Sequence, residues 1–264
     1  MKLLRYFLFL VCAVQFFFAI AFFLQLPFVI GLWPFPGTTP LTFIFFSSFF
    51  AAAAASTLWA SASGIDGALA GIGLDYLAIF APATILAFRL GTDGNDSRMI
   101  IFGFECMLGA FFGLGLFLWS VRLPIVSALP MPGLVRWSFA LFILALLFAG
   151  GRLILKMPNT IPWTITPELS VLMGWMFIGA AVYFAYGLLR PSWQNAAGQL
   201  AGFLAYDLVL IVPFLNRLPV VPTEQKLSLI LYILVLIYSG AVAIYYLFLR
   251  RPAKSISSIP SPGL

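Results

Sequence analysis

Long apolar segments alternate with short polar connections along the whole chain. Each segment holds about 18 to 25 residues, enough for an α-helix to cross a hydrocarbon core of about 30 Å. The pattern predicts an all-α bundle of about eight transmembrane helices, at residues 6–30, 41–63, 67–88, 99–121, 137–156, 169–189, 197–216 and 228–249. The last residues, 251–264, are rich in serine and proline, a composition that predicts a disordered cytoplasmic tail.

The first apolar segment has a second interpretation. Lys2 and Arg5 precede an apolar run that includes Ala19-Ile20-Ala21, a pattern that also occurs in secretory signal peptides. The apolar character continues to Ile30, which is longer than the hydrophobic region of a typical signal peptide. We therefore expect a retained membrane helix; cleavage would remove one span.

Composition supports a membrane environment. Of the 264 residues, 63% are hydrophobic and 8% are charged, whereas a soluble domain carries about 25% charged residues. So few charges cannot cover a water-exposed surface, so we expect the lipid bilayer to surround the protein. The net charge of +6 comes from basic residues at the ends of apolar segments. This distribution is typical of membrane loops and argues against nucleic acid as a partner.

The chain contains no histidine, and its two cysteines, Cys12 and Cys106, lie inside apolar segments. The lack of histidine excludes His-ligated haem, His metal sites and histidine acid–base catalysis. Cysteines in such segments are typical of small buried side chains rather than of disulfides or metal ligands. We therefore expect no metal and no cofactor.

Basic residues divide unevenly between the two sides of the predicted bundle. Of the 14, eight fall on the N-terminal side: Lys2, Arg5, Arg122, Arg136, Arg190, Arg250, Arg251 and Lys254. The other six are Arg89, Arg98, Arg152, Lys156, Arg217 and Lys226. Because cytoplasmic loops are enriched in basic residues, we expect both termini to be cytoplasmic. The four arginines of the second group are interpreted as interfacial anchors, with attraction of an anionic headgroup or solute as the alternative.

The two halves of the chain carry similar landmarks. Thr39-Pro40 precedes the second predicted helix and Thr166-Pro167 the sixth, 127 residues later. Each is predicted to start its helix, because threonine accepts hydrogen bonds from free N–H groups and proline has none to leave unpaired. The opening Trp33-Pro34 followed by Thr39-Pro40 resembles multispan bacterial membrane proteins. The resemblance implies a bacterial-type plasma membrane and no particular function.

The third and seventh predicted helices match more closely. Gly67, Gly71 and Pro82 recur 131 residues later, as Gly198, Gly202 and Pro213. The matches predict a tandem repeat of two four-helix units, residues 1–131 and 132–250. Since four is an even number, both units cross the membrane in the same direction, and the pseudo-two-fold axis follows the membrane normal. The Gly-xxx-Gly pairs are interpreted as close helix contacts.

Three acidic residues lie within the predicted spans: Asp75, Glu105 and Asp207. An ionisable group at membrane depth costs roughly 2.5–3.5 kcal/mol on insertion scales, so these residues are candidates for binding a proton, a cation or a basic solute. Pro82 and Pro213 are candidate helix breaks, where a freed carbonyl could act as a further ligand. The alternative is structural: buried acids that are protonated or hydrogen-bonded to Tyr76 and Tyr206.

The three acids do not follow the repeat. In the alignment of the halves, Asp75 matches Tyr206 and Asp207 matches Tyr76, a shift of one position that rotates the side chain by about 100°. Glu105 matches Ile233 and has no acidic counterpart. Any acidic site between the repeats is therefore expected to be asymmetric.

The sequence carries no motif of a known catalytic class. It has no P-loop, no dinucleotide-binding glycine fingerprint, no Gly-x-Ser-x-Gly elbow and no lysine in mid-span for a Schiff base. We therefore do not expect an enzyme, and we predict a transporter of a small solute or ion with an asymmetric acidic site. The alternatives are a non-catalytic subunit or scaffold of a larger complex, and an intramembrane enzyme acting on lipid, including an aspartyl enzyme built on Asp75 and Asp207.

Overall fold

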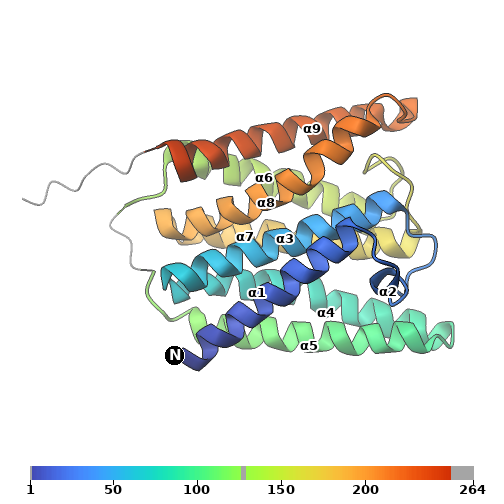
Figure 1. Cartoon of the computed structure of the whole chain (residues 1–264), viewed down its shortest axis with the longest axis horizontal. Helices are drawn as coiled ribbons and strands as arrows, with labels where there is room; N and C mark the ends of the chain where they lie inside the picture. Colours follow the sequence, from blue (N-terminus) through green and yellow to red (C-terminus); the bar gives the residue numbers. More distant parts are fainter. Residues whose placement is uncertain (1, 126–128, 251–264) are drawn as a thin grey trace, which may run out of the picture.

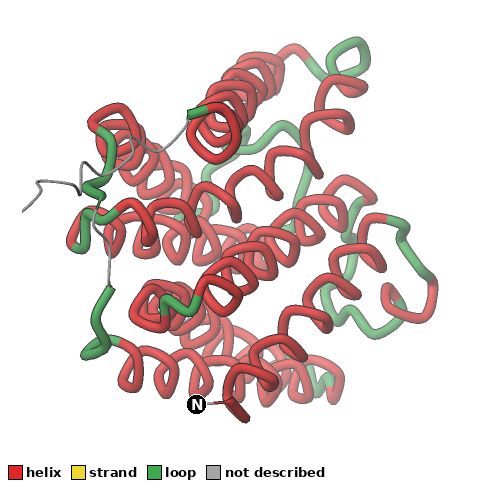
Figure 2. The backbone as a smooth tube through the Cα atoms, turned by 60° about the vertical axis from the view of Figure 1, so that its left-hand side comes forward, coloured by secondary structure: helices red, strands yellow, loops and turns green. Residues whose placement is uncertain are grey.

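The computed structural model describes residues 2–125 and 129–250, a set of long helices joined by short loops (Figure 1). The elements are α1 (Lys2–Phe23), α2 (Pro27–Ile30), α3 (Pro40–Ser63), a 3-10 turn (Asp66–Ala68), α4 (Leu69–Asp93), α5 (Ser97–Ser120), α6 (Gly133–Ile154), α7 (Pro167–Leu189), α8 (Trp193–Arg217), α9 (Thr223–Ile244) and a π-helical turn (Tyr245–Leu249). No strand occurs among the described residues (Figure 2). Eight of these helices are long and apolar enough to span a membrane, which confirms the all-α class and the expected number of spans. The predicted tail, 251–264, lies outside the described residues.

The first predicted span, 6–30, is wrong in its last part, residues 24–30. Helix α1 ends at Phe23, and the chain turns before the short helix α2 begins at Pro27. Gln25 adopts a positive φ of 51°, which is incompatible with a continuous helix. Pro27 has no N–H and occupies the first position of α2, where none is needed.

The two threonine–proline pairs start their helices as expected. Thr39 caps α3 by accepting a hydrogen bond from the N–H of Thr42, and Thr166 caps α7 by accepting one from Leu169. In both helices the proline follows directly at the first helical position. Each cap satisfies a donor that would otherwise face the membrane interface unpaired.

The outer surface of the bundle is rich in large apolar side chains. Trp137 is 76% exposed and Ile85 is 71% exposed, and leucines and phenylalanines of α1, α5, α6 and α9 are exposed along most of each helix. Soluble proteins do not present apolar surfaces of this extent to water. The surface and the eight apolar helices therefore fit an integral membrane protein.

The spanning helices form two layers of four. One layer runs α1–α3–α8–α9 and the other runs α5–α4–α7–α6, and extensive packing occurs between neighbours within a layer. Figure 1 looks onto these layers, with α9, α8, α3 and α1 following one another from top to bottom. Close backbone approach across the layers is limited, since α3 comes near α4 and α7 comes near α8 at few points.

Glycines set the close approach of neighbours within a layer. A Cβ atom on Gly73 of α4 would lie 2.7 Å from the carbonyl oxygen of Gly113 in α5. Likewise, a Cβ atom on Gly150 of α6 would lie 2.9 Å from the carbonyl oxygen of Gly174 in α7. Backbones that lie this close gain packing contacts in a membrane, where lipid removes the hydrophobic drive between helices.

Aromatic rings fill much of the space between the layers. Phe45 of α3 packs against Phe177 of α7 at a centroid distance of 5.6 Å. Phe142 of α6 packs edge-on against Phe203 of α8 at 4.8 Å. Rings hold the two backbones further apart than glycines do. The layers therefore meet through side chains rather than through backbone contacts.

The helices alternate in direction, so both ends of the described chain lie on the same side of the bundle (Figure 1). Two of the basic residues used for the orientation, Arg251 and Lys254, lie outside the described residues. The cytoplasmic location of the termini therefore stays a prediction.

The glycine contacts predict that a glycine-to-alanine substitution changes stability differently at two positions of α5. In Gly113→Ala, the new methyl group would meet the carbonyl oxygen of Gly73 at 2.8 Å, so we expect a loss of about 1–3 kcal/mol in unfolding free energy. In Gly115→Ala the methyl group meets nothing within 4 Å, and the better helix former should leave stability unchanged or raise it by up to about 1 kcal/mol. Thermal unfolding in detergent measures both; equal effects would contradict the packing described for α4 and α5.

Candidate functional site

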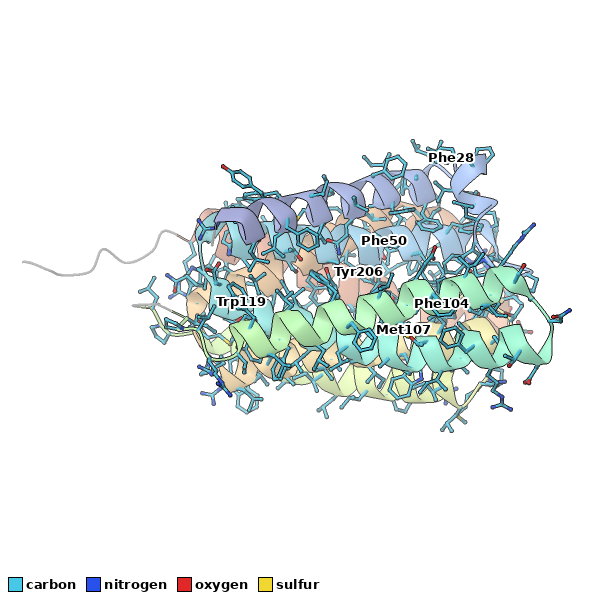
Figure 3. The ribbon with its side chains drawn as sticks, turned by 90° about the horizontal axis from the view of Figure 1, so that it is seen from below. Phe28, Phe50, Phe104, Met107, Trp119 and Tyr206 are labelled. Carbon is cyan, nitrogen blue, oxygen red and sulfur yellow. The ribbon has the colours of Figure 1, made fainter. Side chains whose placement is uncertain are left out.

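A large cavity of about 560 Å³ lies between the two helix layers. All eight spanning helices contribute to its lining, together with the loop between α6 and α7. Figure 3 looks from the side of α1 and α5, and the labelled Phe50 and Tyr206 appear between these two helices. The lining is mainly aromatic and aliphatic, with phenylalanines from six helices: Phe46, Phe49, Phe50, Phe80, Phe102, Phe142, Phe148, Phe177, Phe184 and Phe203.

Asp75 is the charged residue of the cavity interior. It lies on α4, where Gly179 of the neighbouring α7 leaves room for its carboxylate: a Cβ atom on Gly179 would lie 2.6 Å from Asp75 Oδ1. That oxygen is buried and has no hydrogen-bond partner in the part of the chain that the structure describes. A carboxylate so placed is costly at membrane depth unless a cation, a proton or a donor satisfies it.

The neighbouring Tyr76 is part of a separate polar cluster. Its hydroxyl accepts a hydrogen bond from Gln15 Nε2 of α1 and lies 3.5 Å from Thr57 Oγ1 of α3. These contacts join α4 to the opposite layer. The sequence alternative, a bond between Tyr76 and a buried acid, is not among the described hydrogen bonds.

Another polar group lies where α7 faces α8. Gln199 is 1% exposed, and its amide nitrogen donates to the carbonyl oxygen of Tyr183. Its other amide atom, Oε1, is buried without a partner among the described residues. Gln199 and Tyr183 both line the cavity. A solute next to Asp75 would therefore find further hydrogen-bonding groups nearby.

The opposite end of the cavity carries balanced charges. Arg152, at the end of α6, lines the cavity, and its guanidinium donates to Thr160 Oγ1 and to the carbonyl oxygen of Pro158, each at 3.3 Å. Glu224, at the start of α9, lines the same end. One positive and one negative residue leave this end without net charge, in contrast to the interior around Asp75.

Asp207 lies outside the cavity. It is 4% exposed on α8 and faces α9, where a Cβ atom on Gly240 would lie 3.6 Å from Asp207 Oδ2. Neither carboxylate oxygen forms one of the hydrogen bonds within 2–125 and 129–250 by strict geometry, and the Ser239 hydroxyl of α9 is the polar group that lies nearby. The preceding residue, Tyr206, lines the cavity instead, because one position along a helix turns the side chain by about 100°. Its hydroxyl is hydrogen-bonded to that of Tyr232 in α9.

Glu105 lies on the outer surface of α5, where it is exposed. The structure therefore does not bring Asp75, Glu105 and Asp207 together: one lies in the cavity, one between α8 and α9, and one faces outward. This arrangement leaves an aspartyl enzyme, which needs two adjacent carboxylates, without geometric support.

The two prolines lie inside continuous helices. Helix α4 runs through Pro82 and helix α8 runs through Pro213. Each proline lacks the N–H that would bond to the carbonyl four residues earlier, at Ala78 and Val209. Both carbonyls therefore lack their usual helical donor, but neither helix is broken at its proline.

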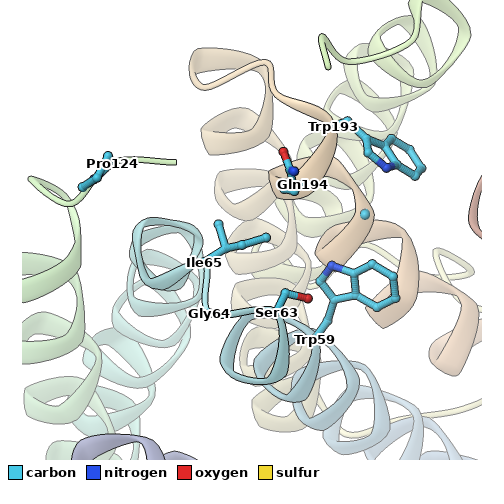
Figure 4. A pocket seen from close by; sticks show the side chains of 8 residues that line it. Trp59, Ser63, Gly64, Ile65, Pro124, Trp193 and Gln194 are labelled. Atoms are coloured by element: carbon cyan, nitrogen blue, oxygen red, sulfur yellow. The ribbon is translucent and has the colours of Figure 1, made fainter. Parts of the chain in front are cut away.

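A second cavity of about 300 Å³ lies at the N-terminal side of the bundle, between the end of α3 and the start of α8 (Figure 4). Trp59 and Trp193 contribute its largest side chains, and Gln194 contributes a polar one. Trp59 Nε1 and Gln194 Oε1 are buried without partners among the described residues. The cavity also borders Pro124, next to the stretch 126–128 that the structure does not describe, so we assign it no ligand.

Comparisons of the chain with protein-family models, with curated proteins and with solved structures give no match. The candidate site therefore depends on geometry alone. Asp75 is predictable from the sequence by its acidic side chain at membrane depth, whereas the phenylalanines around it are not, because phenylalanine is abundant on every face of these helices. The interpretation of Arg152 as an interfacial anchor misses its place in the cavity lining. The sequence gives no signal that the loop after α6 folds back to the Arg152 side chain.

The cavity predicts that two adjacent alanines of α7 tolerate enlargement differently. Ala180 lines the cavity, whereas Ala181 is 2% exposed and is not part of the lining. We expect Ala180→Leu to change the unfolding free energy by less than about 1 kcal/mol, and Ala181→Leu to cost about 1–3 kcal/mol through overpacking. Thermal unfolding of both variants in the same detergent checks this. If Ala180→Leu is as destabilising as Ala181→Leu, the space next to Ala180 is closed.

Proposed function

We propose that this protein is a membrane carrier for a small, largely apolar solute that bears a positive charge, with Asp75 as the residue that binds the charge. The observation that carries the proposal is the carboxylate of Asp75, with an unpartnered oxygen, inside an aromatic-lined cavity to which all eight spanning helices contribute.

The chemistry of the lining favours this class of solute. Phenylalanine rings attract a cation through their negative faces, and they bury the apolar body of an organic ion at the same time. Asp75 supplies the opposite charge in a region of low dielectric, where the attraction is stronger than in water. The lining holds some oxygen atoms, such as those of Tyr76, Tyr183 and Gln199, but aromatic and aliphatic side chains make up most of it, which favours an organic cation over a small inorganic one that needs several oxygen ligands. Arg152 and Glu224 balance each other at the far end of the cavity, so the net charge there favours neither cations nor anions.

Asp75 can also take up a proton in place of the solute. One carboxylate that binds either a proton or an organic cation supports exchange of the two across the membrane. Such exchange requires that the cavity open alternately to each side. Across the layers the helices meet through side chains rather than through close backbone contacts, and we propose that one layer moves relative to the other along this boundary.

Under a duplication of the chain, the two layers that move are related to each other by the pseudo-two-fold axis. We propose that residues 1–131 and 132–250 are two copies of one four-helix unit. The helix neighbours support this: α1–α3 corresponds to α6–α7, α4–α5 corresponds to α8–α9, and α3–α8 corresponds to α4–α7 when the halves are exchanged. The carboxylate of Asp75 has Tyr206 at the equivalent position, so the solute site itself is asymmetric.

A second function, that of a membrane subunit in a larger complex, is favoured by one observation. Glu105 is an acidic residue on the outward face of a membrane-spanning helix, where lipid alone cannot satisfy its charge. The two functions are compatible, because the cavity and the outer face of α5 involve different side chains.

Transport of an aromatic cation tests the proposal directly. We predict that purified protein in liposomes accelerates the uptake of ethidium when the interior is acidic, and that protons leave in exchange. Asp75→Asn removes the charge while keeping the size, so uptake should fall by about tenfold or more, since about 1.4 kcal/mol of lost attraction corresponds to a factor of ten. Ethidium fluorescence and a trapped pH dye measure the two fluxes.

Asp207→Asn is the matched control, because Asp207 is a buried carboxyl of the same type that lies outside the cavity. We expect this variant to keep at least half of the wild-type rate. Thermal unfolding of each variant separates a loss of transport from a loss of fold. Uptake no faster than in protein-free liposomes, or equal uptake by wild type and Asp75→Asn, would overturn the proposal.

A further inference from the structure

The outward face of α5 carries a carboxylate at membrane depth. Glu105 lies eight residues after Ser97, the first residue of the helix, which places it about 12 Å along the axis at ~1.5 Å per residue. The whole helix is long enough to cross the hydrocarbon core. The helix is about 6 Å longer than a core of about 30 Å, so about 3 Å projects at each end. Glu105 therefore lies roughly 9 Å inside the core, beyond the reach of a glutamate side chain to the headgroups.

The surroundings of Glu105 are apolar. Ile101, Phe104 and Leu108 lie on the same face and are 58%, 52% and 66% exposed, and Figure 3 shows Phe104 on α5. Glu105 forms no hydrogen bond or ion pair with any residue within 2–125 and 129–250. Acidic residues inside membrane helices nearly always face the bundle interior or pair with another group. This one does neither within the described chain.

The missing counterpart is a basic or strongly donating side chain at the same depth. A second copy of this chain does not offer one, because every described lysine and arginine lies at or near a helix end. Two facing copies would instead bring two Glu105 carboxylates together. Charge complementarity therefore favours a different membrane protein, one whose transmembrane helix carries a lysine or arginine inside the hydrocarbon core, within reach of Glu105.

We infer that the face of α5 formed by Ile101, Phe104, Glu105 and Leu108 is a docking surface for a partner transmembrane helix that carries a basic residue inside the hydrocarbon core, within reach of Glu105. The basic side chain pairs with Glu105, and the flanking apolar residues pack against the partner helix. This surface goes beyond the proposed carrier function, since none of these four residues lines the cavity.

A model transmembrane helix tests the inference with the full-length protein in phosphatidylcholine liposomes. The probe is a leucine–alanine peptide of membrane-spanning length with one central lysine, carrying an acceptor dye. The donor dye is attached to a cysteine introduced at Ser97, an exposed position at the start of α5; both native cysteines are buried. Energy transfer measured against peptide concentration gives the association constant.

We expect the central-lysine peptide to associate with the wild type about five- to tenfold more tightly than a peptide with leucine in place of the lysine. Glu105→Leu should remove this difference, and because residue 105 faces outward the variant should unfold at the wild-type temperature or above. A peptide with its lysine moved to one end should behave as the leucine peptide does, since the charges no longer meet.

Two results would overturn the inference. One is equal association of the lysine peptide with wild type and with Glu105→Leu. The other is a loss of self-association in Glu105→Leu without any peptide, which would make a second copy the occupant of the face. Neither result depends on ethidium transport, so a failure here leaves the carrier proposal standing, and the reverse also holds.

Discussion

The contrast between glycine contacts and aromatic contacts governs this structure. Within each layer, glycines let neighbouring helices approach until backbone atoms touch, as at Gly73 and Gly113. Between the layers, rings such as Phe45 and Phe177 keep the helices apart. In a membrane, helices associate through packing rather than through exclusion of water. The helices of one layer are therefore closely packed, and the cavity lies between the layers among the aromatic rings.

The position of Asp75 follows from the same contrast. Gly179 of α7 provides the room for its carboxylate at a contact within one layer, and the side chain borders the cavity between the layers. Asp75 thus belongs to a closely packed layer and faces the cavity. A carrier needs this combination, because binding requires fixed groups and release requires a movable boundary. Asp207 is also acidic, but it does not border the cavity, because it faces Gly240 in the contact between α8 and α9.

Much of the fold could be predicted from sequence, and the reasons are local. Span length and charge scarcity identified the helices, and the pairs Thr39-Pro40 and Thr166-Pro167 identified two helix starts to the residue. The end of α1 was missed because the turn at Gln25 occurs within an apolar run that hydropathy alone does not divide. The candidate site was predictable only in part. Asp75 is conspicuous by its acidic side chain. Whether a carboxylate faces a cavity, a helix or lipid depends on the rotation of its helix about its own axis. Hydropathy gives no information on that rotation for Glu105 or Asp207.

The central claim is that the cavity beside Asp75 receives an organic cation, and cysteine accessibility tests it most directly. In a background with both native cysteines changed to alanine, Ala180→Cys places a thiol in the cavity lining and Ala181→Cys places one in the packed layer. The account predicts that N-ethylmaleimide modifies Ala180→Cys far faster than Ala181→Cys, and that ethidium slows the reaction only while Asp75 is intact. Equal modification of the two thiols, or equal protection by ethidium after Asp75→Asn, would contradict it.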